Sequence, residues 1–166
     1  PGYYGVKLTD HKVRIELTAT PHVAMHKYFF EGEEGSVYID FQSGSVGSRK
    51  DYDNRVVFSD VRIKNDSTIV GHQIVRAWTR RQLFFVMKFD RPFVSVKDVT
   101  GEKDSKAPKK VFRFDTGKEE QLQVKIAYSM VNLEGAERNM EAELDHWNFE
   151  KVKDNADKEW NRYLSR

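Results

Sequence analysis

The sequence predicts a mainly β protein, an antiparallel β-sandwich followed by two C-terminal helices. Three observations support this prediction. Apolar and polar residues alternate along most of residues 2–131, turn-forming residues interrupt the alternation at short intervals, and helical spacing begins only after residue 132. A chain of 166 residues with 39% hydrophobic and 13% aromatic residues can also build one packed core. Strands joined by short turns, without helices between them, are typical of antiparallel sheets packed face to face.

Nine strands are predicted in the first 131 residues. Val13–Leu17 and Leu122–Met130 alternate regularly, as expected for strands with one face in water. Leu83–Phe89 is apolar at nearly every position, which predicts a central strand covered on both faces. The other strands are predicted from shorter runs: Val23–Phe30, Val37–Phe41, Val57–Ile63, Ile69–Trp78, Val94–Val99 and Val111–Phe114.

Two amphipathic helices are predicted after the strands. Apolar residues recur at spacings of three and four on both sides of Asn148, which separates the helices. They are Leu133, Ala136, Met140, Leu144 and Trp147 in the first helix, and Phe149, Val152, Ala156, Trp160 and Leu164 in the second. The large side chains on the final turns need a partner surface. We therefore expect a piece of a longer protein, with a β-sandwich over residues 1–132 and a helical linker over residues 133–166.

The composition argues against several classes of partner and site. A net charge of +2, from 28 basic and 26 acidic residues, creates no large field that would attract nucleic acid or an anionic membrane. Charged residues interrupt every apolar run, so no membrane span is expected. The absence of cysteine excludes a disulfide framework, a zinc–thiolate site and a thiol nucleophile within this chain.

One group of residues suggests a carbohydrate-binding site. His72, Arg76 and Trp78 share parity on the run Gly71–Trp78, so an unbroken strand would place them on one face. An indole ring can stack on a sugar ring while a guanidinium binds its hydroxyl groups. The alternative interpretation is a cation–π pair at the edge of a sheet, with no ligand.

Two other groups have the residue types of a metal site but lack its full pattern. Asp51, Asp53 and Asn54 resemble the start of a calcium loop, but the glycine and the distal glutamate of an EF-hand are missing. A solvated polar loop is the favoured interpretation. His22 and His26 are four residues apart in a segment with strand-forming neighbours, so structural histidines are favoured over metal ligands.

Four segments carry a family resemblance. They are PGYYGVKL (1–8), IELTATPHVAMHKY (15–28), AWTRRQLFFVMKFDRPF (77–93) and LEGAERNMEAELDHWNFEKVKDNADKEWNRYLSR (133–166). In this order the segments resemble the N-terminal region of glycoside hydrolase family 92, the exo-acting α-mannosidases. The tail is the most specific of the four, with its Asn-Met-Glu-Ala-Glu core and its ending Trp-Asn-Arg-Tyr-Leu-Ser.

The resemblance implies a supersandwich-like N-terminal β-sandwich that a helical linker joins to an (α/α)₆ catalytic barrel. It also implies calcium-assisted, inverting hydrolysis of terminal α-1,2-linked mannose in glycans, with carboxylates as general acid and base at a site between the two domains. The barrel supplies the catalytic acids and the calcium ligands, so no catalytic or metal residue is assigned to this sequence. Calcium is expected only in the full-length parent, which the family's habits place in the periplasm, at the cell surface or outside the cell.

The leading hypothesis is that this chain is the non-catalytic sandwich of such an enzyme and is inactive alone. Trp147, Trp160, Tyr163 and Leu164 are then the expected contacts to the barrel. Two alternatives stay open: an autonomous carbohydrate-binding module that uses His72, Arg76 and Trp78, and a sandwich that only positions a neighbouring domain.

Overall fold

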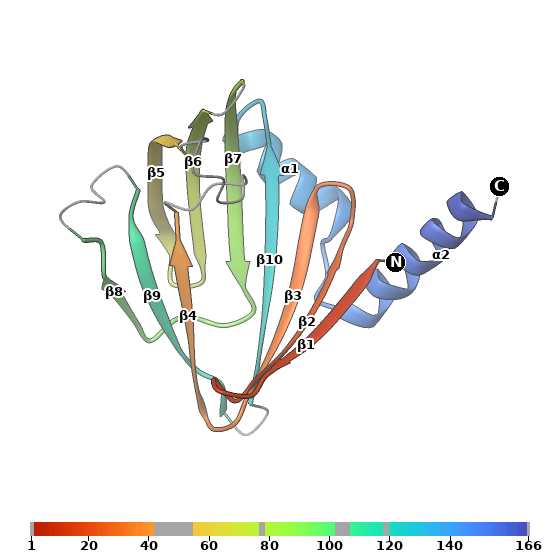
Figure 1. Cartoon of the computed structure of the whole chain (residues 1–166), viewed down its shortest axis with the longest axis horizontal. Helices are drawn as coiled ribbons and strands as arrows, with labels where there is room; N and C mark the ends of the chain where they lie inside the picture. Colours follow the sequence, from red (N-terminus) through yellow and green to blue (C-terminus); the bar gives the residue numbers. More distant parts are fainter. Residues whose placement is uncertain (1, 42–54, 77–78, 102–106, 118–119, 166) are drawn as a thin grey trace.

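A computed structural model describes residues 2–41, 55–76, 79–101, 107–117 and 120–165. The described residues form ten strands and two helices, which confirms the mainly β prediction (Figure 1). The strands are β1 (Tyr3–Leu8), β2 (Val13–Ala19), β3 (Val23–Phe30), β4 (Glu34–Asp40), β5 (Arg55–Asn65), β6 (Thr68–Arg76), β7 (Arg80–Phe89), β8 (Ser95–Asp98), β9 (Lys109–Asp115) and β10 (Gln121–Ser129), and the helices are α1 (Leu133–Glu143) and α2 (Phe149–Leu164).

Seven strands form the larger sheet, in the order β1-β2-β3-β10-β7-β6-β5, with antiparallel pairing between neighbours. β7 lies in its interior between β10 and β6, as the apolar run 83–89 predicts. β1 is an edge strand that was not among the nine predicted. Its residues are exposed or only half-buried, so Tyr3–Leu8 carries little of the alternation that marks a strand with one buried face.

The smaller sheet, in the order β4-β9-β8, packs on one face of the larger sheet. The core between the two sheets is rich in phenylalanine. Phe112 and Phe114 of β9 point inward, and their rings lie 5.9 Å and 4.8 Å from the ring of Phe89 on β7. All three side chains are at most 1% exposed. Burial of several large aromatic rings supplies much of the stabilisation of such a sandwich.

The two helices pack on the opposite face of the larger sheet. Ala136 and Met140 of α1 and Phe149 and Val152 of α2 belong to the same buried cluster as sheet residues such as Met25. Each helix begins at an asparagine whose side chain accepts a hydrogen bond from a backbone N–H three residues later, at 2.8 Å in α1 and 3.0 Å in α2. The predicted break at Asn148 is confirmed, and this N-cap is its physical cause.

α1 is shorter than its apolar pattern. It ends at Glu143, so Leu144 becomes the C-cap and Trp147 lies in the segment between the helices. The Nζ of Lys125 donates a hydrogen bond of 3.0 Å to the carbonyl of Leu144. A cation at this position satisfies a terminal carbonyl and interacts favourably with the negative end of the helix. A residue from β10 therefore helps to decide where the helix ends, which the local spacing does not reveal.

Candidate functional site

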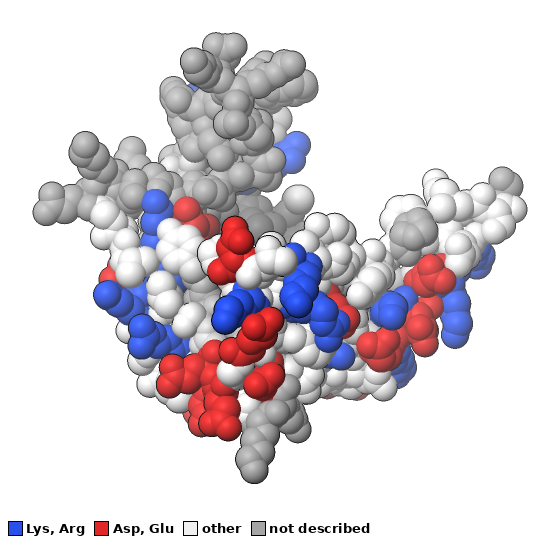
Figure 2. Space-filling model, turned by 60° about the horizontal axis from the view of Figure 1, so that its bottom comes forward, with Lys and Arg blue, Asp and Glu red and all other residues white. Residues whose placement is uncertain are grey.

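The second half of α2 stands away from the domain. Phe149 and Val152 in its first turn are 2% and 4% exposed, whereas every residue from Asp157 to Leu164 is exposed. The helix end points away from the sheets in Figure 1, and Figure 2 shows it standing clear of the body, with charged side chains gathered on one side. Trp160, Tyr163 and Leu164 are 46%, 67% and 60% exposed. An apolar group of this size on a free helix end is typical of an interaction surface.

A groove of about 830 Å³ lies between this part of α2 and the first three strands. Its lining is mainly apolar, with Tyr4, Leu17 and Pro21 on the sheet side and Trp160 and Tyr163 on the helix side. The charged groups in its lining come from α2, as Glu159 and Arg162. The groove therefore offers an aromatic wall and one charge of each sign.

His26 is the histidine on the sheet side of the groove. Burial lowers the pKa of this histidine, and its Nδ1 lies 2.7 Å from the hydroxyl of Tyr28. Burial also raises the pKa of the Tyr28 phenol to about 12. His26 is therefore uncharged at neutral pH, and it adds no charge to the sheet side of the groove.

A second hollow, of about 580 Å³, lies beyond the turn between β2 and β3. It is lined by Tyr128 at the end of β10 and by Met130 and Val131, which are 62% and 75% exposed. The alternation predicts Met130 as the last residue of a strand, whereas β10 ends at Ser129, so the sequence carries no signal that Met130 and Val131 are exposed. We call the two hollows and the turn between them the strand-end surface, made of Tyr4, Thr20–His22, Tyr128, Met130, Val131, Trp160 and Tyr163.

The turn in the middle of the strand-end surface is held by Glu143, the last residue of α1. Its carboxylate accepts hydrogen bonds from the Thr20 hydroxyl at 2.5 Å and the His22 backbone N–H at 2.9 Å, and it lies 2.5 Å from His22 Nδ1. Burial raises the pKa of Glu143, but the hydrogen bonds from Thr20 and His22 outweigh it and hold this pKa below its ordinary value. Helix α1 thus fixes the position of the turn between the two hollows.

Among the residues that the structure describes, Trp147 lines neither of the two hollows. Its ring is 4.1 Å from the Nζ of Lys125, and it packs partly buried against the core under the helices. Burial, and then the nearby positive charge of Lys88, lower the pKa of Lys125 to about 8, against an opposing effect of Asp145. Trp147 therefore covers a buried ammonium group of its own domain, and Trp160, Tyr163 and Leu164 are the predicted contact residues that the structure leaves most exposed.

The predicted carbohydrate site is only partly described. His72 and Arg76 both lie on β6, with Arg76 exposed at its end, while Trp78 lies outside the described residues. His72 stacks on Phe84, with ring centroids 4.1 Å apart and planes at 6°, and Phe58 lies 5.7 Å away on its strand neighbour β5. Its Nε2 atom is buried without a hydrogen-bond partner among the described residues. Sugar binding here stays a prediction.

The two groups with the residue types of a metal site, which the sequence predicts to be a polar loop and structural histidines, differ in what the structure describes. Asp51, Asp53 and Asn54 lie outside the described residues. His22 and His26 belong to different local networks, with Glu143 and Tyr28 as their respective partners. Within the described ranges, no group of three or more histidine, aspartate and glutamate side chains is arranged to hold a metal ion.

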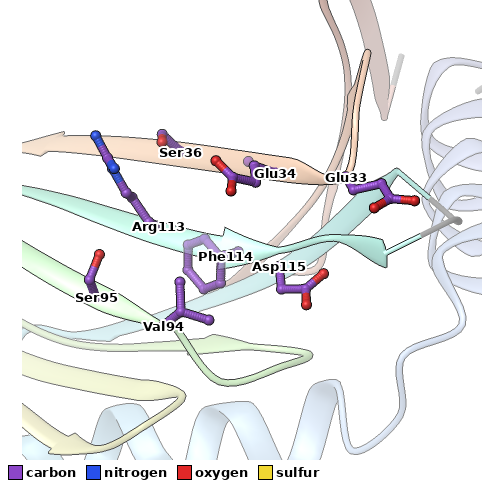
Figure 3. Close-up of a pocket in the computed structure, with 9 residues that line it drawn as sticks. Glu33, Glu34, Ser36, Val94, Ser95, Arg113, Phe114 and Asp115 are labelled. Carbon is purple, nitrogen blue, oxygen red and sulfur yellow. The ribbon is translucent and has the colours of Figure 1, made fainter.

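A polar hollow of about 360 Å³ lies over the small sheet, where β4 begins and β9 ends. Its lining includes Glu33, Glu34, Arg113 and Asp115. In Figure 3 the three carboxylates are spread along the strands and do not converge on one point. Acid–base hydrolysis of a glycosidic bond needs two carboxyl groups facing the same bond, so this arrangement does not form such a pair.

Comparisons with known proteins agree with this architecture. The family model described as "Glycosyl hydrolase family 92 N-terminal domain" matches residues 1–129. No curated protein matches the chain. Among solved structures, the chain is similar to the family GH92 α-mannosidase BT3965 from Bacteroides thetaiotaomicron, with 25% identity, a TM-score of 0.81 and coverage of 99% of this chain but 24% of that one.

Two further structures show the same fold. The inverting mannosidase BT2199 from Bacteroides thetaiotaomicron VPI-5482 is 21% identical, with a TM-score of 0.78 over 99% of this chain and 22% of that chain. A bacterial glucoamylase solved with acarbose is 13% identical, with a TM-score of 0.55 over 99% of this chain and 29% of that chain. The chain therefore spans about a quarter of the length of the solved structures that it matches. None of the helices in the described ranges has the length and apolar character needed to cross a membrane.

Proposed function

Because the chain belongs to the N-terminal domain family of glycosyl hydrolase family 92, we propose that it is the non-catalytic β-sandwich of an exo-acting α-mannosidase. The parent enzyme, in this proposal, removes terminal α-1,2-linked mannose from glycans by inverting, calcium-dependent hydrolysis, in the periplasm, at the cell surface or outside the cell. The similarity to an α-mannosidase over 99% of this chain supports the proposal. That similarity covers 24% of the mannosidase chain, so most of the proposed enzyme lies in other segments.

The observation that carries the proposal is the strand-end surface. It exposes large apolar side chains at one end of a well-packed sandwich, next to a helix that continues past the domain (Figure 1). In the proposal a helical catalytic domain covers Trp160, Tyr163 and Leu164, while Trp147 packs between the helices and the larger sheet and holds the segment between α1 and α2 in place. The sandwich then holds one side of the catalytic site in a fixed place, which is how rigid domains position reacting groups.

The hollows of the strand-end surface do not supply the chemistry themselves. Among the described residues, the larger hollow has one carboxylate in its lining, Glu159, and the smaller has none. Inverting hydrolysis needs an acid and a base about 6.5–9.5 Å apart. Calcium needs several oxygen ligands, and within the described ranges no three histidine, aspartate or glutamate side chains are arranged to hold a metal ion. In the proposal the acid, the base and the calcium belong to the catalytic domain.

Complementation tests the proposed function. The chain is assayed on an aryl α-mannoside and on α-1,2-mannobiose with calcium, alone and after mixing with a separately produced catalytic domain of the same family. The expected result is no turnover alone and a gain of activity on mixing. Tyr163→Asp should weaken the complementation, and Tyr38→Asp, at another exposed tyrosine on β4, should not. Turnover by the chain alone would refute the proposal.

A second candidate function is an autonomous carbohydrate-binding module. The observation that favours it is Phe58, which is 47% exposed and gives the face around His72 an accessible aromatic ring. Titration calorimetry with mannose and manno-oligosaccharides separates the two functions. A module should bind sugar measurably and lose binding in Arg76→Ala, whereas the sandwich of an incomplete site should release no heat.

A further inference from the structure

Ala156 is the last residue of α2 that is partly buried, since every residue from Asp157 to Leu164 is exposed. It packs against Gly2, the residue directly before β1, and Figure 1 shows the start of β1 beside α2. Both Gly2 and Ala156 line the groove. The contact between them therefore lies at the point where the helix leaves the domain.

Gly2 has no room for a side chain at this contact. A Cβ here would lie 3.0 Å from the Cβ of Ala156, 3.1 Å from its carbonyl carbon and 3.3 Å from the backbone nitrogen of Asp157. All three atoms belong to α2, and the last two are backbone atoms that cannot rotate away. The φ angle of Gly2 is +99°, a conformation that residues with a side chain rarely adopt. Space and backbone conformation both require glycine at this position.

The start of β1 is held in place from the sheet side. The carbonyl of Gly2 accepts a hydrogen bond of 2.8 Å from the hydroxyl of Thr18 on β2, and Thr18 is 5% exposed. The next residue, Tyr3, pairs with Thr18 in the sheet, and its ring lies 6.5 Å from the ring of Phe149. Because Gly2 is tied to the sheet, a side chain added there would be accommodated by a displacement of α2.

A small displacement at Ala156 is amplified along the helix. Phe149 is 2% exposed and anchors the first turn, and at 1.5 Å per residue it lies about 10 Å before Ala156 along the axis. Ordinary contacts of a Cβ are 3.4–4 Å long, so an added Cβ 3.0 Å from Ala156 would push the helix away. A push of about 1 Å at Ala156 rotates α2 about Phe149 by about 5° and moves Tyr163 by about 2 Å.

We propose that Gly2 is a positioning residue, because the absence of a side chain at this point sets the angle at which α2 leaves the sandwich. The angle in turn determines where Trp160, Tyr163 and Leu164 lie. Its consequence for the enzyme rests on the proposed function, in which a catalytic domain covers these three side chains. The angle itself does not depend on that function.

Residual dipolar couplings of the backbone amides measure the angle between α2 and the larger sheet in solution. Gly2→Ala should rotate α2 by about 5° relative to the sheet. Gly32→Ala is the matched control, because Gly32 also has a positive φ, of +131°, but a Cβ there would have no atom within 4 Å. This control imposes the same kind of backbone strain and should leave the helix angle unchanged.

A second pair of variants approaches the contact from the helix. Ala156→Val adds two methyl groups to the Cβ that faces Gly2, and it leaves the backbone of Gly2 as it is. It should rotate α2 in the same direction as Gly2→Ala. Asn155→Val is the matched control, because Asn155 is an exposed neighbour on the same helix. This pair tests the proposal even if Gly2→Ala does not fold.

Two results would overturn the proposal. They are an unchanged helix angle in both Gly2→Ala and Ala156→Val, or an equal rotation in each variant and its control. In the complementation assay, Gly2→Ala should also lower the affinity for the catalytic domain about tenfold, and Gly32→Ala should not. A rotated helix with an unchanged affinity would refute the positioning role.

The two proposals fail separately. If the unmodified chain does not complement a catalytic domain, the proposed function is wrong, whereas the helix angle is still measured in the chain alone. If the angle does not respond to Gly2→Ala and Ala156→Val, the role of Gly2 is wrong, whereas complementation by the unmodified chain is unaffected.

Discussion

Replacement of Glu143 by alanine tests whether α1 holds the turn of the strand-end surface. The carboxylate accepts hydrogen bonds from Thr20 and the His22 backbone and lies beside the His22 ring, and its side chain is 21% exposed. Loss of these bonds leaves the Thr20 hydroxyl and the His22 N–H without their acceptor. Hydrogen bonds to a charged group contribute about 1.5–3 kcal/mol each when buried, and partial exposure lowers that figure. We expect Glu143→Ala to lower the free energy of unfolding by about 2–3 kcal/mol.

The assay is urea unfolding followed by circular dichroism. A loss of this size should shift the midpoint by about 1 M, with an unchanged dependence on urea concentration, and lower the melting temperature by about 6 °C. Glu141→Ala is the matched control, because Glu141 is an exposed glutamate two residues earlier in α1. Equal shifts in the two variants would refute the reasoning, since they would show that the hydrogen bonds at the turn contribute nothing beyond a surface charge.

The pH dependence gives a second check on Glu143. The pKa of this carboxyl in the folded chain is below its ordinary value of 4.5. A carboxyl with a depressed pKa stabilises the folded state above its unfolded pKa, and this stabilisation is lost as pH falls through the folded pKa. The difference in stability between the unmodified chain and Glu143→Ala should therefore be complete at pH 6 and shrink below about pH 4.5. A difference that is constant across this range would contradict the assigned role.

Three further predictions concern packing and the buried lysine. Phe149→Ala should lower the free energy of unfolding by about 3–5 kcal/mol, because the side chain is 2% exposed. Trp160→Ala, on the exposed half of the same helix, should change this free energy by less than about 0.5 kcal/mol. Urea unfolding measures both variants. By the same measurement, Gly71→Ala should lower the free energy of unfolding by about 2–3 kcal/mol, because its new Cβ would lie 2.5 Å from the backbone oxygen of Asp60. A variant as stable as the unmodified chain would contradict the close approach of the strands. Burial lowers the pKa of Lys125 to about 8 in the folded chain, so above that pH the unfolded chain binds more protons than the folded chain. The free energy of unfolding should therefore rise by about 2 kcal/mol between pH 8 and 10, relative to that of Lys125→Met. Parallel pH profiles of the two proteins would contradict this.

The candidate surface was predictable only in part. The sequence marks Trp160, Tyr163 and Leu164 as apolar residues at the end of a helix, and the structure finds them exposed. Their contact with a catalytic domain stays a prediction. Trp147 belongs to the apolar spacing of the first predicted helix, but it covers Lys125, a residue 22 positions earlier on a strand. The sequence contains no local signal for that pairing, because the distance depends on how α1 lies across the sheet.

The sequence by itself determined the class of this protein: a β-sandwich, two C-terminal helices and a break at Asn148. These features follow from interactions between residues a few positions apart, namely the alternation of a strand, the spacing of a helix face and the N-cap bond to Lys151. The tertiary structure alone decided the sheet order, the edge position of β1, the end of α1 and the two hollows around Thr20–His22. Each of these depends on contacts such as β3 with β10, about a hundred residues apart, and the pattern within one segment does not specify its distant partner.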